Sequence, residues 1–276
     1  MCLSFILFPW QSENDKFNKL LLNLLNLCIK LYMEKIVIIG GTSGLGLSIA
    51  IELRSRFGNA NILLVGKTKP VDLCNKHNLN FLKIDLSSPY YDWKFCVDSN
   101  FIVYAAGVGR ITSFDEIDEK DVHSTISVNA TNVLQLINSK KKELISLNSC
   151  QISIVTSIAG KVPSPLFALY AASKALVSSY ISSINIELAK KGTKNRITEI
   201  APGYIDGTGL YGQKTNLDKL ASVSKTILNE IEKKKYFIIP QNEKMYLEII
   251  ERAHKDPQEF GFQSYDYKLE EKKKRT

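Results

Sequence analysis

The sequence has few of the residues that build metal sites and disulfide frameworks. Its three histidines, His77, His123 and His254, lie far apart, so none of them form an i,i+4 pair on a helix. The five cysteines are scattered, and no two have the C-x-x-C spacing; they are Cys2, Cys28, Cys74, Cys96 and Cys150. We therefore expect no bound metal, no disulfide framework and a reducing compartment such as the cytoplasm.

The sequence also lacks an apolar run of about 20 residues, the length that a membrane-spanning helix needs. The leucine-rich stretch from Phe17 to Tyr32 has only sixteen residues and is broken by Asn and Lys. The segment from Met1 to Trp10 is apolar but has no basic region before it and no small-residue cleavage site after it. These features argue against both a transmembrane helix and a secretory signal.

Three interpretations of residues 1–32 stay open. The stretch can form an N-terminal helical extension that makes weak peripheral contact with a membrane, with its Asn and Lys side chains toward water. It can instead be an extension that packs on the domain or hangs free. It can also be dispensable, because Met33 begins a segment, Met-Glu-Lys-Ile-Val-Ile-Ile-Gly-Gly, that suits the start of a compact α/β domain.

Net charge does not single out a polyanionic partner. The chain has 36 Lys and Arg against 28 Asp and Glu, a formal charge of +8, and residues 268–276 alone contribute five basic and two acidic side chains. We expect residues 259–276 to be a basic C-terminal tail, and residues 268–276 to be its solvated, frayed end. No stretch interleaves basic and aromatic residues, so we expect no nucleic-acid partner. A composition of 45% hydrophobic and 23% charged residues excludes a disordered chain.

Apolar strands alternate with helical periodicity from Met33 onward. Short apolar or β-branched runs predict strands at 36–39, 62–65, 81–84, 101–106, 152–155, 197–200 and 237–239. Helix-period apolar residues follow the first strand and recur over 126–137 and 168–189. Such alternation predicts an α/β domain, residues 33–258, with a parallel sheet covered by helices on both faces.

A glycine-rich turn joins the first predicted strand to its helix. Its sequence is Gly40-Gly41-Thr42-Ser43-Gly44-Leu45-Gly46. Glycines permit a tight turn and a close approach of the backbone, and the helix N-terminus stabilises negative charge. The turn therefore predicts a dinucleotide site that binds the pyrophosphate.

The residue after the second strand bears on the choice of cofactor. NAD sites place a carboxylate about 20 residues beyond the glycines to bind the ribose 2′-hydroxyl. This chain has Lys67 there, 21 residues after Gly46, and we expect no nearby acid to repel a 2′-phosphate. An ammonium attracts a 2′-phosphate, so we expect NADP(H) rather than NAD(H).

Tyr170 and Lys174, in Tyr170-Ala171-Ala172-Ser173-Lys174, lie at i,i+4 and share one helix face. An adjacent ammonium lowers the pKa of a phenol, which can then act as a general acid in reduction and a general base in oxidation. Ser157, at the mouth of the strand 152–155, can hold a substrate oxygen. Asn129 sits within a helical pattern although Asn is a weak helix former, which suggests a specific hydrogen-bonding task.

Together these residues resemble the short-chain dehydrogenase/reductase (SDR) family from Met33 to about Pro240. Gly40, Gly44 and Gly46 match its glycine motif, and Asn129, Ser157, Tyr170 and Lys174 match its catalytic tetrad. The resemblance implies a Rossmann-type doubly wound parallel sheet in a single domain. It also implies cofactor contacts at the glycine turn, at the ends of later strands, and in the loop after the sixth strand; these are Thr42, Ser43, Leu45, Asp85, Leu86, Ala106, Gly107, Pro202, Gly203, Ile205 and Thr208, besides Lys67, Tyr170 and Lys174.

The family's mechanism gives each tetrad residue a role. By resemblance, Tyr170 transfers the proton, Ser157 hydrogen-bonds the substrate oxygen, Lys174 binds the nicotinamide ribose, and Asn129 positions a water that relays protons to Lys174. The substrate is expected to be a small carbonyl or alcohol compound of undetermined class, covered by a short lid from Tyr204 to about Leu220. Family members commonly form homodimers or homotetramers through their two long helices.

The sequence departs from the family pattern at four positions. Ile39 replaces a Thr before the glycines, Tyr104 and Ala105 replace two asparagines, and Gly207 is an added residue before Thr208. We expect these changes to lose supporting side-chain hydrogen bonds but no group that does chemistry. Two alternatives to a cytoplasmic enzyme stay open: a non-catalytic dinucleotide-binding regulatory protein, and a membrane-associated lipid carbonyl reductase that docks through residues 1–32.

Overall fold

The computed structural model describes residues 35–88, 92–146, 149–210 and 214–273. Its strands, in chain order, are β1 (Lys35–Ile39), β2 (Asn61–Gly66), β3 (Asn80–Lys83), β4 (Phe101–Tyr104), β5 (Gln151–Val155), β6 (Ile197–Ile200) and β7 (Phe237–Ile238). All neighbouring strands are parallel, in the order β3-β2-β1-β4-β5-β6-β7. The predicted parallel α/β sheet is confirmed.

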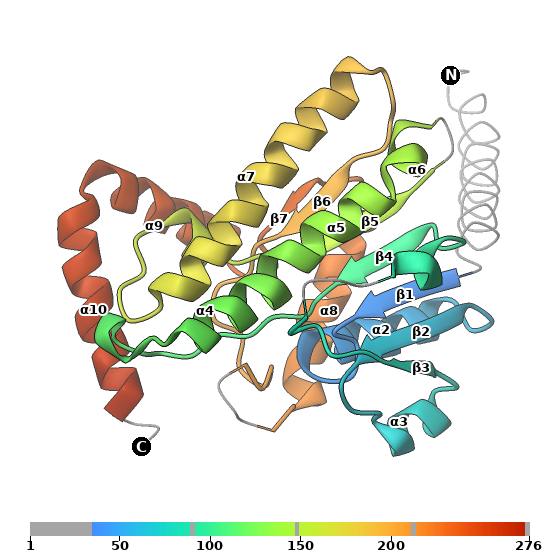
Figure 1. Ribbon diagram of the computed structural model, residues 1–276, viewed down its shortest axis with the longest axis horizontal. Helices are drawn as coiled ribbons and strands as arrows, with labels where there is room; N and C mark the ends of the chain where they lie inside the picture. Colours follow the sequence, from blue (N-terminus) through green and yellow to red (C-terminus); the bar gives the residue numbers. More distant parts are fainter. Residues whose placement is uncertain (1–34, 89–91, 147–148, 211–213, 274–276) are drawn as a thin grey trace, which may run out of the picture.

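Helices connect the strands and cover both faces of the sheet (Figure 1). The α-helices are α2 (Gly44–Arg56), α3 (Val71–Lys76), α4 (Glu119–Ile126), α5 (Asn132–Ser139), α6 (Lys141–Ile145), α7 (Ala168–Lys190), α8 (Leu217–Glu232), α9 (Glu243–Lys255) and α10 (Pro257–Lys273). The short 3-10 helices are η1 (Trp93–Cys96), η2 (Phe114–Glu116) and η4 (Ile158–Lys161), and η3 (Ser127–Thr131) is a π-helix.

Alternate residues of the central strands point to opposite faces of the sheet. Ile36 and Ile38 of β1 join one buried cluster with α2 and α8, whereas Val37 and Ile39 join another with α5 and α7. Strands buried on both faces explain the continuous apolar runs of the sequence. The order of the strands reverses between β1 and β4, and ligands of such sheets bind at the carboxyl ends of the strands at this point.

The expectation of a frayed end over 268–276 is wrong for its described part, because α10 (Pro257–Lys273) is a helix. Asp256 accepts the amide of Glu259 (3.0 Å), and a proline at the first helical position suits a helix start. Gln263 donates to Glu259 one turn earlier (2.6 Å). The boundary at residue 258 therefore falls inside a helix.

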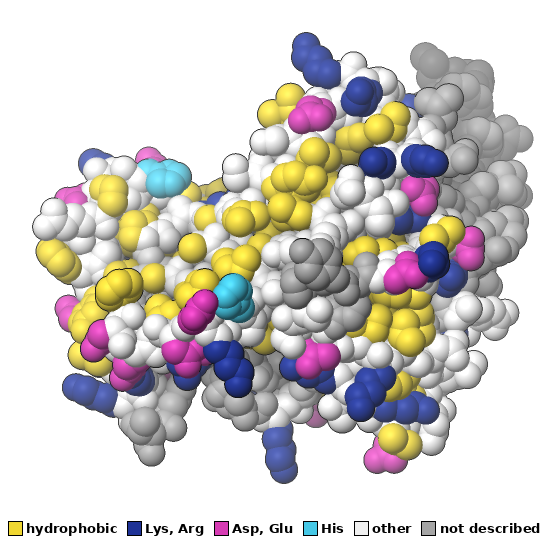
Figure 2. Space-filling model, in the orientation of Figure 1, with side chains coloured by type: hydrophobic (Ala, Val, Ile, Leu, Met, Phe, Trp, Pro, Cys, Tyr) yellow, Lys and Arg dark blue, Asp and Glu magenta, His cyan; other side chains and the backbone are white. Residues whose placement is uncertain are grey.

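Apolar side chains gather on the exposed side of α7 and α5 (Figure 2). Leu176 and Ile186 of α7 are among the exposed large hydrophobic residues. Of the described helices, none has both the length and the apolar character needed to cross a membrane. The three interpretations of residues 1–32 lie outside the described residues.

Candidate functional site

The glycine turn closes the carboxyl end of β1 against the end of β4. Gly40 has a φ of 77°, and a Cβ placed on it would lie 2.3 Å from the amide nitrogen of Ala106. A Cβ on Gly46 would lie 2.3 Å from the carbonyl oxygen of Gly40. Only glycine fits these positions, because the backbones are in direct contact.

The N-terminus of α2 is suited to an anion. Its first turn carries no acidic residue, and Ser43 at the N-cap makes no side-chain capping bond. The amide of Gly44 donates instead to the Thr215 hydroxyl (2.9 Å), which comes from far along the chain. Helix amides and the helix dipole favour negative charge here, so the turn fits the pyrophosphate of a dinucleotide.

Lys67, at the end of β2, does have an acidic neighbour in space. Its ammonium lies 3.1 Å from the Asp85 carboxylate, which follows β3, and the two side chains are 64% and 55% exposed. The expectation that no nearby acid opposes a 2′-phosphate is therefore wrong: residues 18 positions apart meet because β2 and β3 are adjacent. The amide and hydroxyl of Ser87, followed by Lys67, lower the pKa of Asp85, so this carboxylate is charged at neutral pH.

Leu86 is buried beside a residue that the sequence patterns did not reveal. Asn132, which is fully buried at the start of α5, directs its amide nitrogen at the carbonyls of Leu86 (2.8 Å), Ser88 (3.1 Å) and Ser127 (2.9 Å). It thereby fixes the segment after β3. Asn132 also sits within a helical pattern, three residues after Asn129, and the same reasoning about Asn in helices applies to it.

Tyr104, one of the departures from the family pattern, supplies a hydrogen bond of its own. Its side chain is fully buried, and its hydroxyl donates to the carbonyl of Val128 (2.6 Å). It therefore ties β4 to the π-helix η3. The expected loss of support for the fourth strand is at least partly compensated.

Asn129 connects three segments around the site. Its side-chain oxygen accepts the amide of Val108 (2.8 Å), and its nitrogen donates to the carbonyl of Val108 (2.8 Å) and to the Ser173 hydroxyl (3.0 Å). Ser173 in turn donates to the carbonyl of Tyr170 (2.6 Å). Asn129 lies in the π-helix η3, a distortion often found at functional sites. The side chain of Asn129 therefore joins the segment after β4 to α7.

Tyr170 and Lys174 lie together, buried, on α7. The Lys174 ammonium is 5.5 Å from the centre of the Tyr170 ring, and it donates a hydrogen bond to the carbonyl of Val155 (2.9 Å). A Cβ placed on Gly107 would lie 3.4 Å from the same ammonium, so the end of β4 meets the pair. Burial lowers the pKa of Lys174 to about 8.

The Tyr170 ring is held between an aromatic ring and the backbone. Phe167 stacks on it, with ring centroids 4.2 Å apart and an interplanar angle of 21°. On Gly109 a Cβ would lie 2.5 Å from the ring of Tyr170, so only glycine allows this approach. The ring therefore has a fixed orientation.

Ser157 lies at the start of η4, directly after β5 and Thr156. Its hydroxyl accepts the amide of Ala159 (3.1 Å) and lies 3.3 Å from the carbonyl of Pro202. The structure thus brings Ser157 together with the loop after β6.

The loop after β6 is held from two sides. The side chain of Gln241 accepts the amide of Gly203 (3.2 Å) and donates to the carbonyl of Tyr204 (3.1 Å). A Cβ placed on Gly203 would lie 2.0 Å from the hydroxyl of Tyr246 in α9. Gln241 and Tyr246 are thus loop-positioning residues that no sequence motif indicated.

The continuation of this loop contacts the glycine turn. Ile205 is buried, and its carbonyl accepts the Thr208 hydroxyl (3.2 Å). A Cβ on Gly44 would lie 2.3 Å from the carbonyl oxygen of Thr208. The added Gly207 has a φ of 83°, a conformation that other residues rarely adopt. Thr208 therefore lies against the glycine turn.

A small cavity adjoins Tyr170. One wall is formed by Phe167 to Tyr170, and the other by Arg110, Thr112 and Asp121 with their neighbours. The described residues of the expected lid, from Tyr204 to about Leu220, contribute nothing to this lining; Tyr211 lies outside the described residues.

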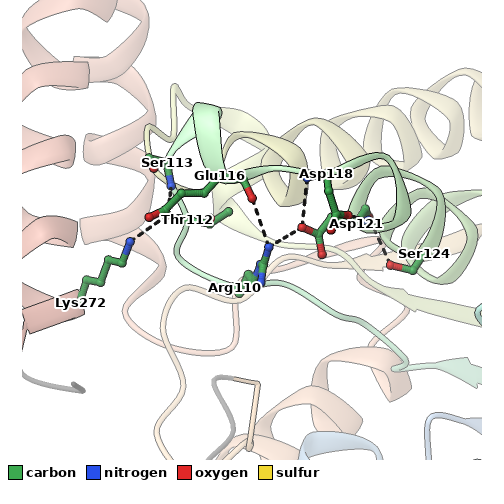
Figure 3. A network of polar contacts seen from close by, with 8 residues as sticks. All are labelled: Arg110, Thr112, Ser113, Glu116, Asp118, Asp121, Ser124 and Lys272. Atoms are coloured by element: carbon green, nitrogen blue, oxygen red, sulfur yellow. Dashed lines mark hydrogen bonds and ion pairs between the residues drawn. The ribbon is translucent and has the colours of Figure 1, made fainter.

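A polar network supports the outer wall of the cavity (Figure 3). Arg110 pairs with Asp121, and Glu116 accepts the amide of Ser113 (3.1 Å). Lys272 of α10 lies 3.0 Å from Glu116 and is the largest cause that lowers the pKa of Glu116 to about 2. The C-terminal helix is thus tied to the segment that lines the cavity.

Comparison with known proteins gives consistent matches. Residues 93–218 match the family model for short chain dehydrogenases. A short-chain type dehydrogenase/reductase of Sinorhizobium fredii is 27% identical over 183 residues, which cover 64% of this chain and 72% of that protein. The 3-oxoacyl-[acyl-carrier-protein] reductase FabG of Chlamydia muridarum is 27% identical over 195 residues, covering 66% of this chain and 77% of the reductase.

Solved structures share the fold at low identity. A short chain dehydrogenase/reductase from Burkholderia phymatum in complex with NAD superposes with a TM-score of 0.69 at 17% identity, covering 81% of this chain and 93% of that chain. A short-chain dehydrogenase from Sphingobium yanoikuyae in complex with NADPH gives a TM-score of 0.64 at 18% identity, covering 80% and 93%.

Proposed function

The chain belongs to the short-chain dehydrogenase/reductase family of NAD(P)-dependent oxidoreductases, and we propose that it transfers a hydride reversibly between NADP(H) and a carbonyl or alcohol substrate. The observation that carries the proposal is the buried pair of Tyr170 and Lys174 beside the end of β4. Within the described part of the chain, the Lys174 ammonium of this pair donates a single hydrogen bond, to a backbone carbonyl. A buried ammonium with so few acceptors suits a site that binds further polar groups.

The glycine turn and the N-terminus of α2 would hold the pyrophosphate, and Lys174 would hold the nicotinamide ribose. The nicotinamide, when bound, supplies or accepts the hydride. Pro202, Gly203, Ile205 and Thr208 form the loop that would line the nicotinamide side. Gln241 and Tyr246 hold part of this loop, so it is preorganised.

Tyr170 would donate a proton to the carbonyl oxygen in reduction and accept it from the alcohol in oxidation. An ammonium beside the ring favours the ionised phenol, which is the form that accepts the proton. Ser157 would hydrogen-bond the same substrate oxygen. Asn129, fixed by Val108 and Ser173, would position the water that relays protons to Lys174.

NADP(H) is the proposed cofactor because Lys67 is exposed at the end of β2, where the ribose 2′-position would lie. Asp85 offsets part of its charge, so the preference over NAD(H) is expected to be modest. Asp85 and Leu86 would contact the adenine. Of the solved structures with the same fold, one is a complex with NAD and another is a complex with NADPH.

We propose a homodimer or homotetramer that pairs through α5 and α7. Exposed apolar residues on α7, such as Leu176 and Ile186, support this assembly because pairing would bury them. The proposed compartment is the cytoplasm. Three cysteines, Cys74, Cys96 and Cys150, are free and buried, which suits a reducing environment.

The test is a panel of carbonyl and alcohol compounds, 3-oxoacyl thioesters included because one relative is named for them. Turnover is followed by nicotinamide absorbance with NADPH and NADH in parallel. Tyr170→Phe is expected to lower kcat by about 10²- to 10⁴-fold, because it removes the proton-transfer group. Cofactor affinity, measured by calorimetry, should stay nearly unchanged.

Tyr180→Phe is the matched control, because Tyr180 lies on the same helix and packs with the buried cluster under α7. It should keep wild-type turnover. Near wild-type turnover in Tyr170→Phe would contradict the assignment. Cofactor binding without turnover of any compound would favour the non-catalytic dinucleotide-binding alternative.

A further inference from the structure

Strand β6 carries a buried carboxylate that no step of the proposed reaction uses. Glu199 is 3% exposed and lies on a strand that is otherwise apolar or hydroxylic. It accepts the Thr156 hydroxyl (2.8 Å) and pairs with Lys161 (3.2 Å). Glutamates are rarely buried without such partners, because removing a charge from water is costly.

The two partners of Glu199 lie on either side of Ser157. Thr156 directly precedes it, and Lys161 is the last residue of η4 (Ile158–Lys161). The Lys161 ammonium also donates to the Ser178 hydroxyl on α7. One carboxylate therefore ties both ends of the turn that carries Ser157 to β6, and through Lys161 to α7.

This turn packs directly on the helix of the catalytic pair. A Cβ placed on Gly160 would lie 2.7 Å from the amide nitrogen of Ala175 and 2.8 Å from the carbonyl carbon of Lys174. On its other side, Ile158 packs against Ala201 and Ile239. Because η4 touches the backbone at Lys174, a displacement of the turn changes where Ser157 lies relative to that residue.

Stability alone is a weak explanation for the charged pair. A buried ion pair recovers little more than its desolvation cost, and apolar replacements are often as stable. Unlike an apolar contact, the ion pair has a preferred geometry. It holds the Glu199 carboxylate and the Lys161 ammonium at a defined separation. From this geometry we propose that Glu199 is a positioning residue, which holds Ser157 in place through Thr156 and Lys161. The inference rests on the proposed function, in which Ser157 binds the substrate oxygen.

Thr156 offers a matched pair of variants that leave the charges in place. Thr156→Val keeps the shape and removes the hydroxyl that binds Glu199, whereas Thr156→Ser keeps the hydroxyl. We expect Thr156→Val to lower kcat about tenfold with the cofactor Kd unchanged, because small displacements of positioned groups slow the chemical step. Thr156→Ser should stay within about twofold of wild type. Glu199→Gln should also lower kcat about tenfold. In the double variant with Thr156→Val, kcat should fall by less than a further twofold.

Hydrogen exchange of backbone amides tests whether Glu199 holds the turn that carries Ser157, and it does not depend on turnover. The amides of Ala159 and Gly160 donate to the hydroxyl and the carbonyl of Ser157. In Thr156→Val both should exchange about tenfold faster, while amides of β5 keep their wild-type rates. Unchanged exchange at both amides overturns the proposal, and so does wild-type kcat in Thr156→Val. If the wild type turns over no compound of the panel, the proposed function fails, and exchange still decides whether Glu199 holds the turn.

Discussion

Two lysines, Lys140 next to the end of α5 and Lys174 on α7, are buried almost completely, and their surroundings differ. Lys140, 2% exposed and next to the end of α5, donates to the carbonyls of Cys96 (3.0 Å) and Val97 (2.9 Å) and pairs with Glu143 (2.7 Å). These acceptors replace the water that the ammonium loses. Lys140 therefore joins η1 to the α5–α6 corner as a structural residue.

Lys174 is 3% exposed and receives far less compensation. It donates to the carbonyl of Val155 and faces the ring of Tyr170, and in the described part of the chain no carboxylate pairs with it. Burial therefore lowers its pKa to about 8. The two ammonium groups are equally buried, but among the described residues Lys140 has three acceptors and Lys174 has one.

The largest expected effect comes from Lys174→Met, which keeps the aliphatic stem and removes the ammonium. We expect kcat/KM to fall by at least about 100-fold, since the Tyr170 phenol loses the neighbouring cation and the nicotinamide ribose loses a hydrogen-bond donor. The free energy of unfolding should be unchanged or higher, because a poorly compensated charge is removed. Steady-state kinetics and urea unfolding measure the two effects. Activity above about half of wild type would contradict the need for the Lys174 ammonium in turnover.

Lys140→Met, the matched control, should have the opposite profile. We expect the free energy of unfolding to fall by about 2–4 kcal/mol, because two carbonyls and the Glu143 carboxylate lose a buried partner. The folded fraction should keep kcat within about twofold. Urea unfolding followed by circular dichroism gives the stability. If Lys140→Met were as stable as wild type, Lys140 would not be the structural counterpart described here.

The pH dependence of the free energy of unfolding gives a further test of how poorly the Lys174 ammonium is compensated. The pKa of Lys174 falls from 10.5 to about 8 on folding, so between these values the unfolded chain binds the extra proton and stability rises with pH. From pH 7 to pH 9 this residue should add about 1 kcal/mol. The observable is the difference between wild type and Lys174→Met in urea unfolding, in which other titrating groups, such as Lys268, cancel. A difference that does not change with pH would contradict the lowered pKa.

The smallest effect is expected at a third lysine, Lys67, whose ion pair with Asp85 is exposed. Lys67→Ala should weaken NADPH binding about three- to tenfold and leave NADH binding unchanged. Asp85→Asn should strengthen NADPH relative to NADH by a few fold, because the ammonium is then unpaired. Fluorescence titration with both cofactors measures each Kd. Equal losses for NADPH and NADH in Lys67→Ala would mean that Lys67 does not read the 2′-phosphate.

Local patterns predicted the parts of the fold that depend on local chemistry. The apolar runs located the strands, and the turn from Gly40 to Gly46 was predicted because closely spaced glycines between a strand and a helix form a local pattern. Asn129 was recognised because a weak helix former in a helical pattern needs a reason. Asn132 gives the same signal and was missed.

Contacts between distant segments could not be predicted from the sequence. The pairing of Lys67 with Asp85 depends on which strands are neighbours, and the hold of Tyr246 on Gly203 depends on where α9 lies. Lys140 belongs to a run of three lysines that reads as a solvated surface. The basic tail was misjudged for a different reason: its charge suggested a frayed end, although Asp256 and Pro257 are ordinary local signals for the start of a helix.

The titration of Lys174 itself tests most directly whether its buried ammonium lacks compensating partners. It can be followed by NMR of lysine side chains labelled at Cε. Lys174→Met assigns its resonance, and Lys268→Met separates it from the other lysine whose pKa burial lowers to about 8. We predict that the Lys174 resonance titrates near pH 8. A Lys174 ammonium that stays protonated above pH 10 would show that it is fully compensated, like an ordinary structural lysine, and would contradict the account.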